Sequence, residues 1–254
     1  MENTLLIGLS RQMTLERQID VIANNVANVN TNGYKADQSL FQEYLMPVAS
    51  ADNFVGKDRK LSYVLDQGTW RDTNQGSLEQ TSNPLDVALD GTGYLAVQTA
   101  GGERYTRNGS LQINSQGQLV TPDGNLVLGT SGPITFQPND HDIIISGTGT
   151  VSVRQGNTLI DSQRGQIRIV NFAQPQQLQK QGANLLSAPN GVAAQPDTKT
   201  MLRQGYVERS NVSAVAEMSH LIQVTRTYTE IASILKQQGD QRKAALDKLA
   251  DVTS

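Results

Sequence analysis

Cysteine is absent from this chain of 254 residues, and histidine occurs only twice. Without cysteine the protein forms no disulfide, binds no metal through thiolates and has no cysteine nucleophile. The 21 Lys and Arg residues nearly balance the 24 Asp and Glu residues, and the basic residues are not clustered with aromatic ones. The electrostatic pattern of a nucleic-acid-binding protein is therefore missing, and we expect no nucleic-acid partner.

Long apolar runs are missing as well. No stretch approaches the roughly 18 apolar residues that a membrane-spanning helix needs, so we expect no direct insertion into a membrane. The first residues, MENTLLIGLSRQM, place Glu2 before a short apolar run and Arg11 after it. A cleaved signal peptide has the opposite order of charge and a longer apolar region, so we expect none.

The first thirty residues have the apolar spacing of a helix. From Leu15 to Val29, apolar residues recur at steps of four and three. Gly33 is suited to the left-handed residue that follows many helix ends, so we expect the helix to stop near Asn30 and Gly33 to need a positive φ angle. The residues expected on its packing stripe are Leu5, Leu9, Leu15, Ile19, Ile22, Val26 and Val29.

From about Asn211 the helical spacing returns. Ile222, Val224 and Ile231 lie beside the main apolar stripe, so the apolar arc covers more than half of the helix circumference. A helix with so wide an arc needs neighbours on more than one side. The main stripe includes Met218, Leu221, Tyr228, Ala232 and Leu235.

Residues 81–209 have the punctuation of a β-domain. Short alternating runs are separated by DG, GG and NG pairs, which favour tight hairpins. Crossover helices, which parallel strands need, are not predicted there, so the strands should be antiparallel. The sequence therefore predicts an α+β fold, with a discontinuous, coiled-coil-like pair of N- and C-terminal helices and a mostly antiparallel, β-rich central domain. The expected divisions are an N-terminal helix (1–35), an extended connecting segment (36–80), a β-rich outer domain (81–209) and a C-terminal helix (210–254).

A run of asparagines, ANNVANVNTNGYK, occupies the end of the first helical stretch. Asn24 and Asn28 share one helix face and Asn25 lies beside them, and an asparagine at a helix seam can fix the register between helices. The alternative is that asparagine occurs here because it favours helix ends and turns, which explains Asn32 better than Asn24 or Asn25. We expect Asn24, Asn25 and Asn28 to set axial register, with Arg226 as a candidate partner at the seam.

Three segments resemble those of a known family. ANNVANVNTNGYK is similar to the N-terminal signature of the flagellar axial proteins, the rod, hook and hook-associated family. GYVERSNVSAVAEMSHLIQVTRTYTEIASIL, which contains Asn211, resembles their C-terminal signature. Between them, the stretch from GSLEQTSNPLDVALDGTGYLAV to GNLVLG resembles the β-domain opening that rod and hook proteins share. The chain most resembles the proximal-rod members, with the distal-rod members as the alternative.

The resemblance implies a structural function. Members of the family pair their terminal helices as an inner domain, stack around an export channel and carry the β-domain outside. We therefore expect a subunit of the bacterial flagellar basal-body rod, located in the periplasm and exported by the flagellar type III apparatus without a cleaved signal peptide. The expected partners are copies of itself, other rod proteins and that export apparatus. No cofactor, no metal and no enzymatic activity are expected.

Other functions were weighed against this one. His141 lies between two aspartates in PNDHD, but a metal site normally needs three or four convergent ligands, and the other histidine, His220, is distant in sequence. The glycine-rich DGTGYL lacks the lysine and the following helix of a phosphate loop, so a hairpin turn explains it better. A β-rich adhesin or carbohydrate-binding module with a helical stalk and a hydrolase with an unrecognised site stay open as alternatives.

Overall fold

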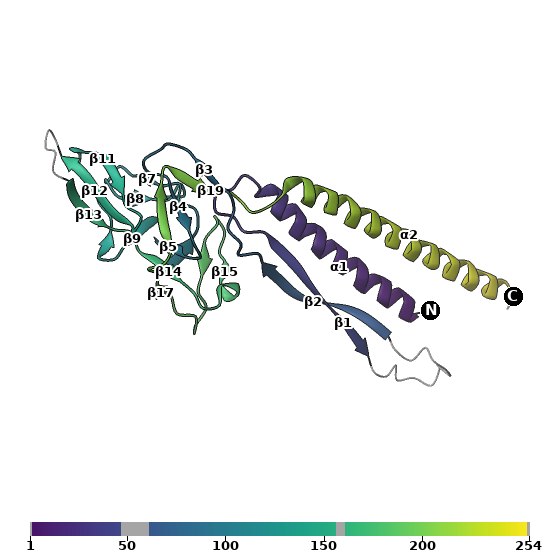
Figure 1. Cartoon of the computed structure of the whole chain (residues 1–254). Coiled ribbons are helices and arrows are strands. Elements are labelled where there is room, and N and C mark those ends of the chain that lie inside the picture. Colours follow the sequence, from purple (N-terminus) through teal and green to yellow (C-terminus); the bar gives the residue numbers. More distant parts are fainter. Residues whose placement is uncertain (1, 47–60, 156–160, 253–254) are drawn as a thin grey trace. The chain divides into compact units, whose positions relative to one another are not determined.

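A computed structural model describes residues 2–46, 61–155 and 161–252 (Figure 1). The chain divides into two compact units, and each is described by itself. The helical unit comprises residues 1–27, 37–70 and 213–254, and the β unit comprises residues 28–36 and 71–212. The chain therefore passes between the units four times, and each unit is assembled from segments that are distant in sequence.

The helical unit is built on two long helices, α1 (Glu2–Ala27) and α2 (Ala214–Val252), which lie side by side. The two helices are antiparallel, because Gln12 Nε2 donates to the Tyr228 hydroxyl at 3.0 Å while Gly8 lies opposite Leu235. A Cβ atom at Gly8 would lie 2.5 Å from Leu235 Cδ2, so this glycine permits close approach of the helices. The predicted pair of terminal helices is confirmed.

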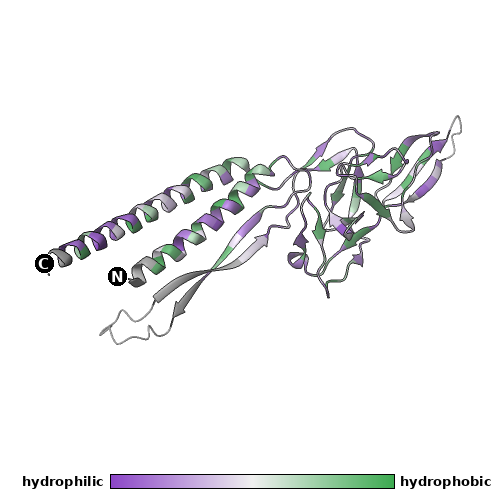
Figure 2. Cartoon of the chain, turned by 180° about the vertical axis from the view of Figure 1, so that it is seen from behind, coloured by the Kyte–Doolittle hydropathy of each residue, from purple (hydrophilic) through white to green (hydrophobic). Residues whose placement is uncertain are grey.

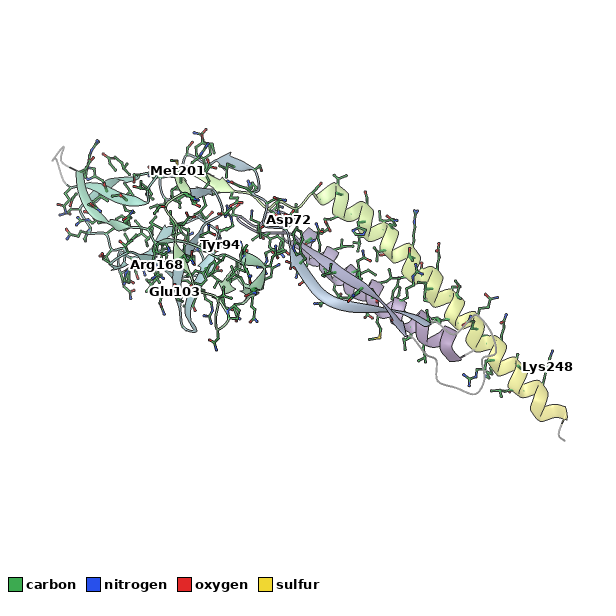
Figure 3. All side chains as sticks on the ribbon, turned by 60° about the horizontal axis from the view of Figure 1, so that its bottom comes forward. Asp72, Tyr94, Glu103, Arg168, Met201 and Lys248 are labelled. Atoms are coloured by element: carbon green, nitrogen blue, oxygen red, sulfur yellow. The ribbon has the colours of Figure 1, made fainter. Side chains whose placement is uncertain are left out.

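The C-terminal part of α2 extends past the first residue of α1. α2 has 39 residues and α1 has 26, and the contact between Gly8 and Leu235 fixes how far they overlap. Residues 241–248 are all exposed, and Lys248 projects from this end of the helix (Figure 3). α1 thus leaves this part of α2 uncovered.

Two strands complete the helical unit. β1 (Asp37–Met46) and β2 (Leu61–Arg71) form a two-stranded sheet, and β1 also packs on α1; only Arg71 of these strands belongs to the β unit. Residues 36–80 were expected to be an extended connecting segment, so the pairing of these strands is a difference from that expectation. Two strands alone are marginally stable, and the packing of β1 on α1 is a tertiary contact that local periodicity does not reveal.

The first helix ends earlier than the periodicity suggests. α1 stops at Ala27 rather than near Asn30, and residues 28–30 form a turn in which the Thr31 amide donates to the Asn28 carbonyl at 3.1 Å. The Asn28 side chain also accepts from the Thr31 hydroxyl at 3.1 Å. Such local bonds compete with the helix and explain why it stops here. Val29, expected on the helix stripe, therefore lies beyond α1.

The β unit contains the remaining described strands. Its largest sheet runs in the order β15, β16, β6, β5, β9, β8, β7, with β10, β14 and β17 added at its sides. A second sheet contains β11, β12 and β13, while β18 pairs with β4 and β19 pairs with β3. The pairings between these strands are antiparallel, as predicted. The bounds are β3 (Leu78–Gln80), β4 (Val87–Asp90), β5 (Tyr94–Thr99), β6 (Gly102–Thr106), β7 (Gln112–Ile113), β8 (Leu119–Val120), β9 (Leu126–Gly129), β10 (Gly132–Pro133), β11 (Asp140–Ile145), β12 (Thr150–Gln155), β13 (Asp161–Gln166), β14 (Ile169–Asn171), η1 (Pro175–Gln177), β15 (Gln179–Lys180), β16 (Leu186–Ser187), β17 (Gln195–Pro196), β18 (Met201–Gln204) and β19 (Tyr206–Glu208).

Strand β5 lies at the centre of the β unit, and both of its faces are buried. Leu95 and Val97 point into one apolar cluster, while Tyr94 and Ala96 point into another on the opposite face. The second cluster also holds Phe172, whose ring packs edge-on against Tyr94 with centroids 5.8 Å apart. The β unit therefore has a dry core of its own.

Candidate assembly site

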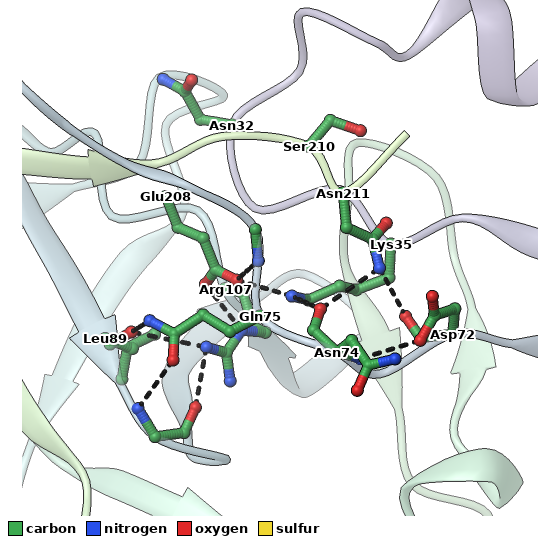
Figure 4. A network of polar contacts seen from close by, with 12 residues as sticks. Asn32, Lys35, Asp72, Asn74, Gln75, Leu89, Arg107, Glu208, Ser210 and Asn211 are labelled. Carbon is green, nitrogen blue, oxygen red and sulfur yellow. Dashed lines mark hydrogen bonds and ion pairs between the residues drawn. The ribbon is translucent and has the colours of Figure 1, made fainter. Parts of the chain in front are cut away.

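A buried ionic cluster of Lys35, Arg107 and Glu208 joins three distant parts of the β unit (Figure 4). Lys35 follows the turn after α1, Arg107 follows β6, and Glu208 ends β19. All three side chains are almost fully buried, and Glu208 is only 1% exposed. A buried charge is costly unless it is paired, so the partners of each group decide whether the cluster is stable.

Every charge in the cluster has short polar contacts. Glu208 Oε1 accepts from Lys35 Nζ at 2.5 Å and from the Gly76 amide at 3.0 Å, and its Oε2 accepts from Arg107 Nε at 2.8 Å. Lys35 Nζ also donates to the Asn74 carbonyl at 2.6 Å. The carboxylate therefore has three donors, two of them charged, which compensates for much of its lost hydration.

Arg107 links the ionic cluster to the turn between β4 and β5. Its two terminal nitrogens donate to the Gly93 carbonyl at 2.8 Å and to the Gly91 carbonyl at 2.9 Å. The guanidinium carbon also lies 5.7 Å from the centre of the Tyr94 ring, within the range of a cation–π contact. One side chain thus connects the carboxylate, the turn between β4 and β5, and the edge of the apolar core.

The surroundings of Lys35 shift its pKa in both directions. Burial, the largest, lowers the pKa of Lys35 from its ordinary value of 10.5, while the Glu208 carboxylate raises it and the neighbouring Arg107 lowers it. Glu208 is therefore the main group that favours the charged form of Lys35, with a smaller contribution from Asp72. Without this carboxylate, two cations would share one buried site.

Gly33, near the end of the N-terminal motif, contacts the backbone of two residues of this cluster. Its φ angle is +70°, so the predicted positive φ is confirmed. Its amide donates to the Glu208 carbonyl at 2.7 Å, and a Cβ atom there would lie 2.5 Å from the Arg107 carbonyl carbon. Only glycine meets both requirements, because other residues strain at this φ and would also collide with the backbone.

The side chain of Asn211 binds two backbone segments that are distant from it in sequence. Its Oδ1 accepts from the Ala36 amide at 2.8 Å, and its Nδ2 donates to the Asp72 and Asn74 carbonyls at 3.0 and 3.2 Å. The Asp72 amide also donates to the Ala36 carbonyl at 2.8 Å. Asn211 therefore holds together three of the segments at which the chain leaves or enters the β unit.

The three helix asparagines have different surroundings. Asn25 is 2% exposed, and its amide makes a reciprocal pair with Asp37, accepting from its N–H at 3.0 Å and donating to its C=O at 2.8 Å. Asn24 is exposed, and Asn28 belongs to the turn after α1. Asn25 therefore holds the first residue of β1 within one chain, and the register role of all three stays a prediction.

The expected packing residues are buried to different degrees. On α1, Ile22 is buried, Leu15, Ile19 and Val26 are half-buried, and Leu9 is exposed. The side chain of Leu5 lies outside the described residues, and Val29 packs with Tyr34 in the β unit. On α2, the half-buried members are Leu221, Tyr228, Ala232 and Leu235.

The most buried residue of α2 belongs to a neighbouring stripe. Val224 is buried, whereas Met218 on the expected stripe is exposed. Tyr228 and Leu235 of the expected stripe contact α1, and Val224 lies one turn from Tyr228 on the same side, so the inward side of α2 includes both the stripe and Val224. Large apolar side chains are therefore left exposed on both helices, and their alternation with polar residues is visible in Figure 2. They are Leu6, Leu9, Met13, Val215, Met218, Ile222, Ile234 and Leu246.

Sequence reasoning did not single out the ionic cluster. The sequence did contain an indication of it. Within the three family-like segments, a charged residue lies beside apolar or aromatic neighbours in NGYK, RYTRN and YVERS. No local rule, however, indicates that Lys35, Arg107 and Glu208 meet. Only the fold brings them together.

The residues weighed for catalysis do not form a site. His141 is exposed, with Nδ1 3.4 Å from the Asn139 carbonyl, and no group of three or more potential metal ligands occurs among the described residues. In DGTGYL, Gly91 has a φ of +136° and strand β5 follows, so the motif is a turn between two strands. The expected hairpin is wrong, because β4 pairs with β18 while β5 pairs with β6, β9 and β14. Within the described ranges, no helix combines the length and apolarity needed to cross a bilayer.

Comparison with protein families gives three matches along the chain. Residues 5–35 match the flagella basal body rod protein model, residues 88–153 match the D1 domain of the flagellar hook proteins FlgE, FlgF and FlgG, and residues 203–247 match the C-terminal model of the FlgE, FlgF and FlgG rod proteins. Lys35, Arg107 and Glu208 each fall in a different one of these regions. The ionic cluster therefore lies where the three family segments converge.

Full-length relatives agree with these matches. The flagellar basal-body rod protein FlgF of Caulobacter vibrioides is 35% identical over 99% of this chain and 100% of its own length. FlgF of Mesorhizobium japonicum is 31% identical over 98% of both chains, and FlgG of Caulobacter vibrioides is 36% identical over 97% of both. Identities at this level across whole chains establish common ancestry and a common fold, and this chain belongs to the flagellar basal-body rod protein family.

Proposed function

We propose that this chain is a structural subunit of the proximal flagellar rod, comparable to the FlgF relatives. In this proposal the terminal helices of many copies assemble into a hollow shaft that transmits torque and surrounds the export channel. The distal rod is the second candidate, because FlgG relatives match nearly the whole chain as well. The FlgF relative from Caulobacter vibrioides aligns over its full length, which favours the proximal assignment.

The observation that carries the proposal is the incomplete burial of the two helices. Met13 is 63% exposed and Val215 is 78% exposed, whereas the β-unit core residues Leu89 and Val97 are fully buried. Large apolar side chains exposed on a long helix indicate an interaction surface. Contacts between copies, and with other rod proteins, would bury them.

Further parts of the proposal concern how the subunit reaches its site. We infer export by the flagellar type III apparatus without a cleaved signal peptide, assembly in the periplasm, and no enzymatic activity. Helices with so little internal burial would gain most of their stability on assembly, so folding of the helical unit and polymerisation would be coupled.

The first experiment is a deletion of the gene in the source bacterium, with electron microscopy of purified basal bodies and a motility assay. A missing or shortened rod without a hook is expected, and the length of the remaining stub separates the proximal from the distal assignment. Complete flagella in the deletion strain would overturn the rod function and favour the adhesin alternative.

The register role of the asparagines is tested in that strain with single variants. Asn25→Leu removes both bonds to the Asp37 backbone, so we expect it to weaken the attachment of β1 in each monomer. Asn24→Leu alters an exposed position, so we expect normal monomer stability with incorrect assembly. Normal motility with Asn24→Leu would remove Asn24 from the register hypothesis.

A further inference from the structure

A pocket of about 330 Å³ opens within the helical unit, between α1, α2 and β1. Val21 and Ile22 supply its apolar wall, while Asp37 and Glu217 contribute carboxylates. Gln18 Nε2 and His220 Nε2 lie 3.1 Å apart at its edge. The pocket thus combines a short apolar wall with acceptor groups.

The charge of the pocket is acidic. Its lining contains two carboxylates and no Lys or Arg. Glu217 is half-buried, and in the described residues its carboxylate receives one long contact, from Asn25 Nδ2 at 3.5 Å. The pocket therefore offers one carboxylate, that of Glu217, whose contact within its own chain is long.

An exposed arginine lies on the opposite face of α2. Arg226 is nine residues from Glu217, which corresponds to about 180° around an α-helix and roughly 14 Å along it. Arg226 therefore cannot enter the pocket of its own chain. One turn away, Ile222 is 54% exposed, so the arginine projects from a partly apolar face. Arginine beside apolar groups is enriched at protein interfaces.

We propose that Arg226 of a second copy inserts into this pocket, with its guanidinium beside Glu217. The methylene stem of Arg226 would pack on Val21 and Ile22, and its donors would bind the Glu217 carboxylate. The inference rests on the proposed rod function, and it specifies one contact between copies.

The symmetry of the contact fits a growing polymer. The pocket and Arg226 lie on different faces of the same molecule, so each copy offers one pocket to a neighbour and one arginine to another. A contact between two different surfaces is heterologous and continues from copy to copy without closing a dimer. One interaction of this kind therefore joins successive copies into a ring or a helical filament rather than a dimer.

The absence of cysteine permits a direct crosslinking test. Gln38→Cys places a thiol at the pocket, and Thr229→Cys places one beside Arg226, which is kept. A short bismaleimide is added to the purified full chain at high concentration and to basal bodies, and the products are separated by denaturing gel electrophoresis. A ladder of crosslinked multimers is expected from the double-cysteine chain.

Charge reversal decides whether Arg226 causes the contact. Adding Arg226→Glu to the double-cysteine chain should reduce the ladder at least tenfold, and adding Glu217→Arg as well should restore most of it. Arg11→Glu, a matched reversal at another exposed helix position, should leave it unchanged. Circular dichroism of each variant checks that the helices are retained.

The outcomes separate this inference from the rod function. No ladder from the double-cysteine chain, or a ladder that Arg226→Glu does not reduce, overturns the Arg226 contact. A ladder that depends on Arg226 in the purified chain, together with complete flagella in the deletion strain, supports the contact and overturns the rod function. A truncated rod in the deletion strain without an Arg226-dependent ladder does the reverse.

Discussion

The β unit and the helical unit bury their apolar residues in different ways. In the β unit, Val87, Leu89, Leu95 and Val97 are fully buried, and the charged side chains of the ionic cluster have partners inside the unit. In the helical unit, the buried apolar residues on the helices are Val21, Ile22 and Val224, among the side chains that the structure describes. The β unit encloses a large apolar core within one chain, although Met201 is exposed, whereas the helical unit leaves most of its described large apolar side chains exposed or half-buried.

The two units of this polypeptide meet different requirements. The β unit has to hold a defined shape, which requires dense packing and satisfied polar groups. The helices have to join other molecules, which requires apolar and charged groups on outward faces. Changes in the β unit should therefore reduce monomer stability, and changes on the outward helix faces should reduce assembly.

The largest expected effect concerns the ionic cluster. Glu208→Gln would leave Lys35 and Arg107 buried without their counter-ion, and removing one partner of a buried charge pair commonly costs about 3–5 kcal/mol. We expect a large fall in the free energy of unfolding, measured by urea denaturation of the full chain. Glu79→Gln, which breaks the exposed pair between Glu79 and Arg209, is the control and should leave the midpoint unchanged. Equal effects would contradict the importance of the cluster.

A pair of apolar truncations tests the comparison directly. Leu89→Ala in the β-unit core should lower the free energy of unfolding by about 2–5 kcal/mol. Met13→Ala on the exposed face of α1 should change it by less than about 0.5 kcal/mol. In cells, Met13→Ala should still reduce rod assembly, as scored by electron microscopy of basal bodies. Normal rods with Met13→Ala would show that this face is not an assembly surface.

Two glycines separate backbone strain from steric collision. Gly33 and Gly124 both have positive φ, at +70° and +82°, but only Gly33 has backbone close to the position of a Cβ atom. Gly124→Ala should cost about 1–2 kcal/mol through strain alone. Gly33→Ala should cost about 1–3 kcal/mol more, because the methyl group would collide with the Arg107 carbonyl. Equal losses in urea denaturation would mean that the loop moves aside without cost.

The smallest expected effect is a pH dependence within the β unit. Hydrogen bonds from Arg164 are the main cause that lowers the pKa of Asp140 below its ordinary value of 3.8, although burial opposes the shift. Because the folded pKa is the lower one, this stabilisation is present above pH 3.8 and is lost as the pH falls through the folded value. Asp140→Asn should therefore lose less stability than the wild type over that interval. Arg164→Gln should behave in the same way, and an unchanged acid profile in both would contradict the assignment.

Much of the architecture could be predicted because it depends on local chemistry. The terminal helices follow from apolar spacing, the antiparallel strands follow from turn residues, and the positive φ of Gly33 follows from its place after a helix. The end of α1 was less predictable. The apolar spacing is compatible with three further helical residues, but the bonds between Asn28 and Thr31 form a turn there instead. The degree of burial within the α2 arc was also open, since an apolar arc over half the circumference contains both Met218, which is exposed, and Val224, which is buried.

By itself, the sequence determined the two kinds of unit, the order of the elements and the family motifs, because each depends on residues that are near one another along the chain. Only the tertiary structure decided that Lys35, Arg107 and Glu208 share one buried site and that Asn25 holds the start of β1. The Lys35, Arg107 and Glu208 contacts join residues up to 173 positions apart. Such a pairing is selected by the desolvation of charges in a closed core, and that energy exists only after the chain has folded.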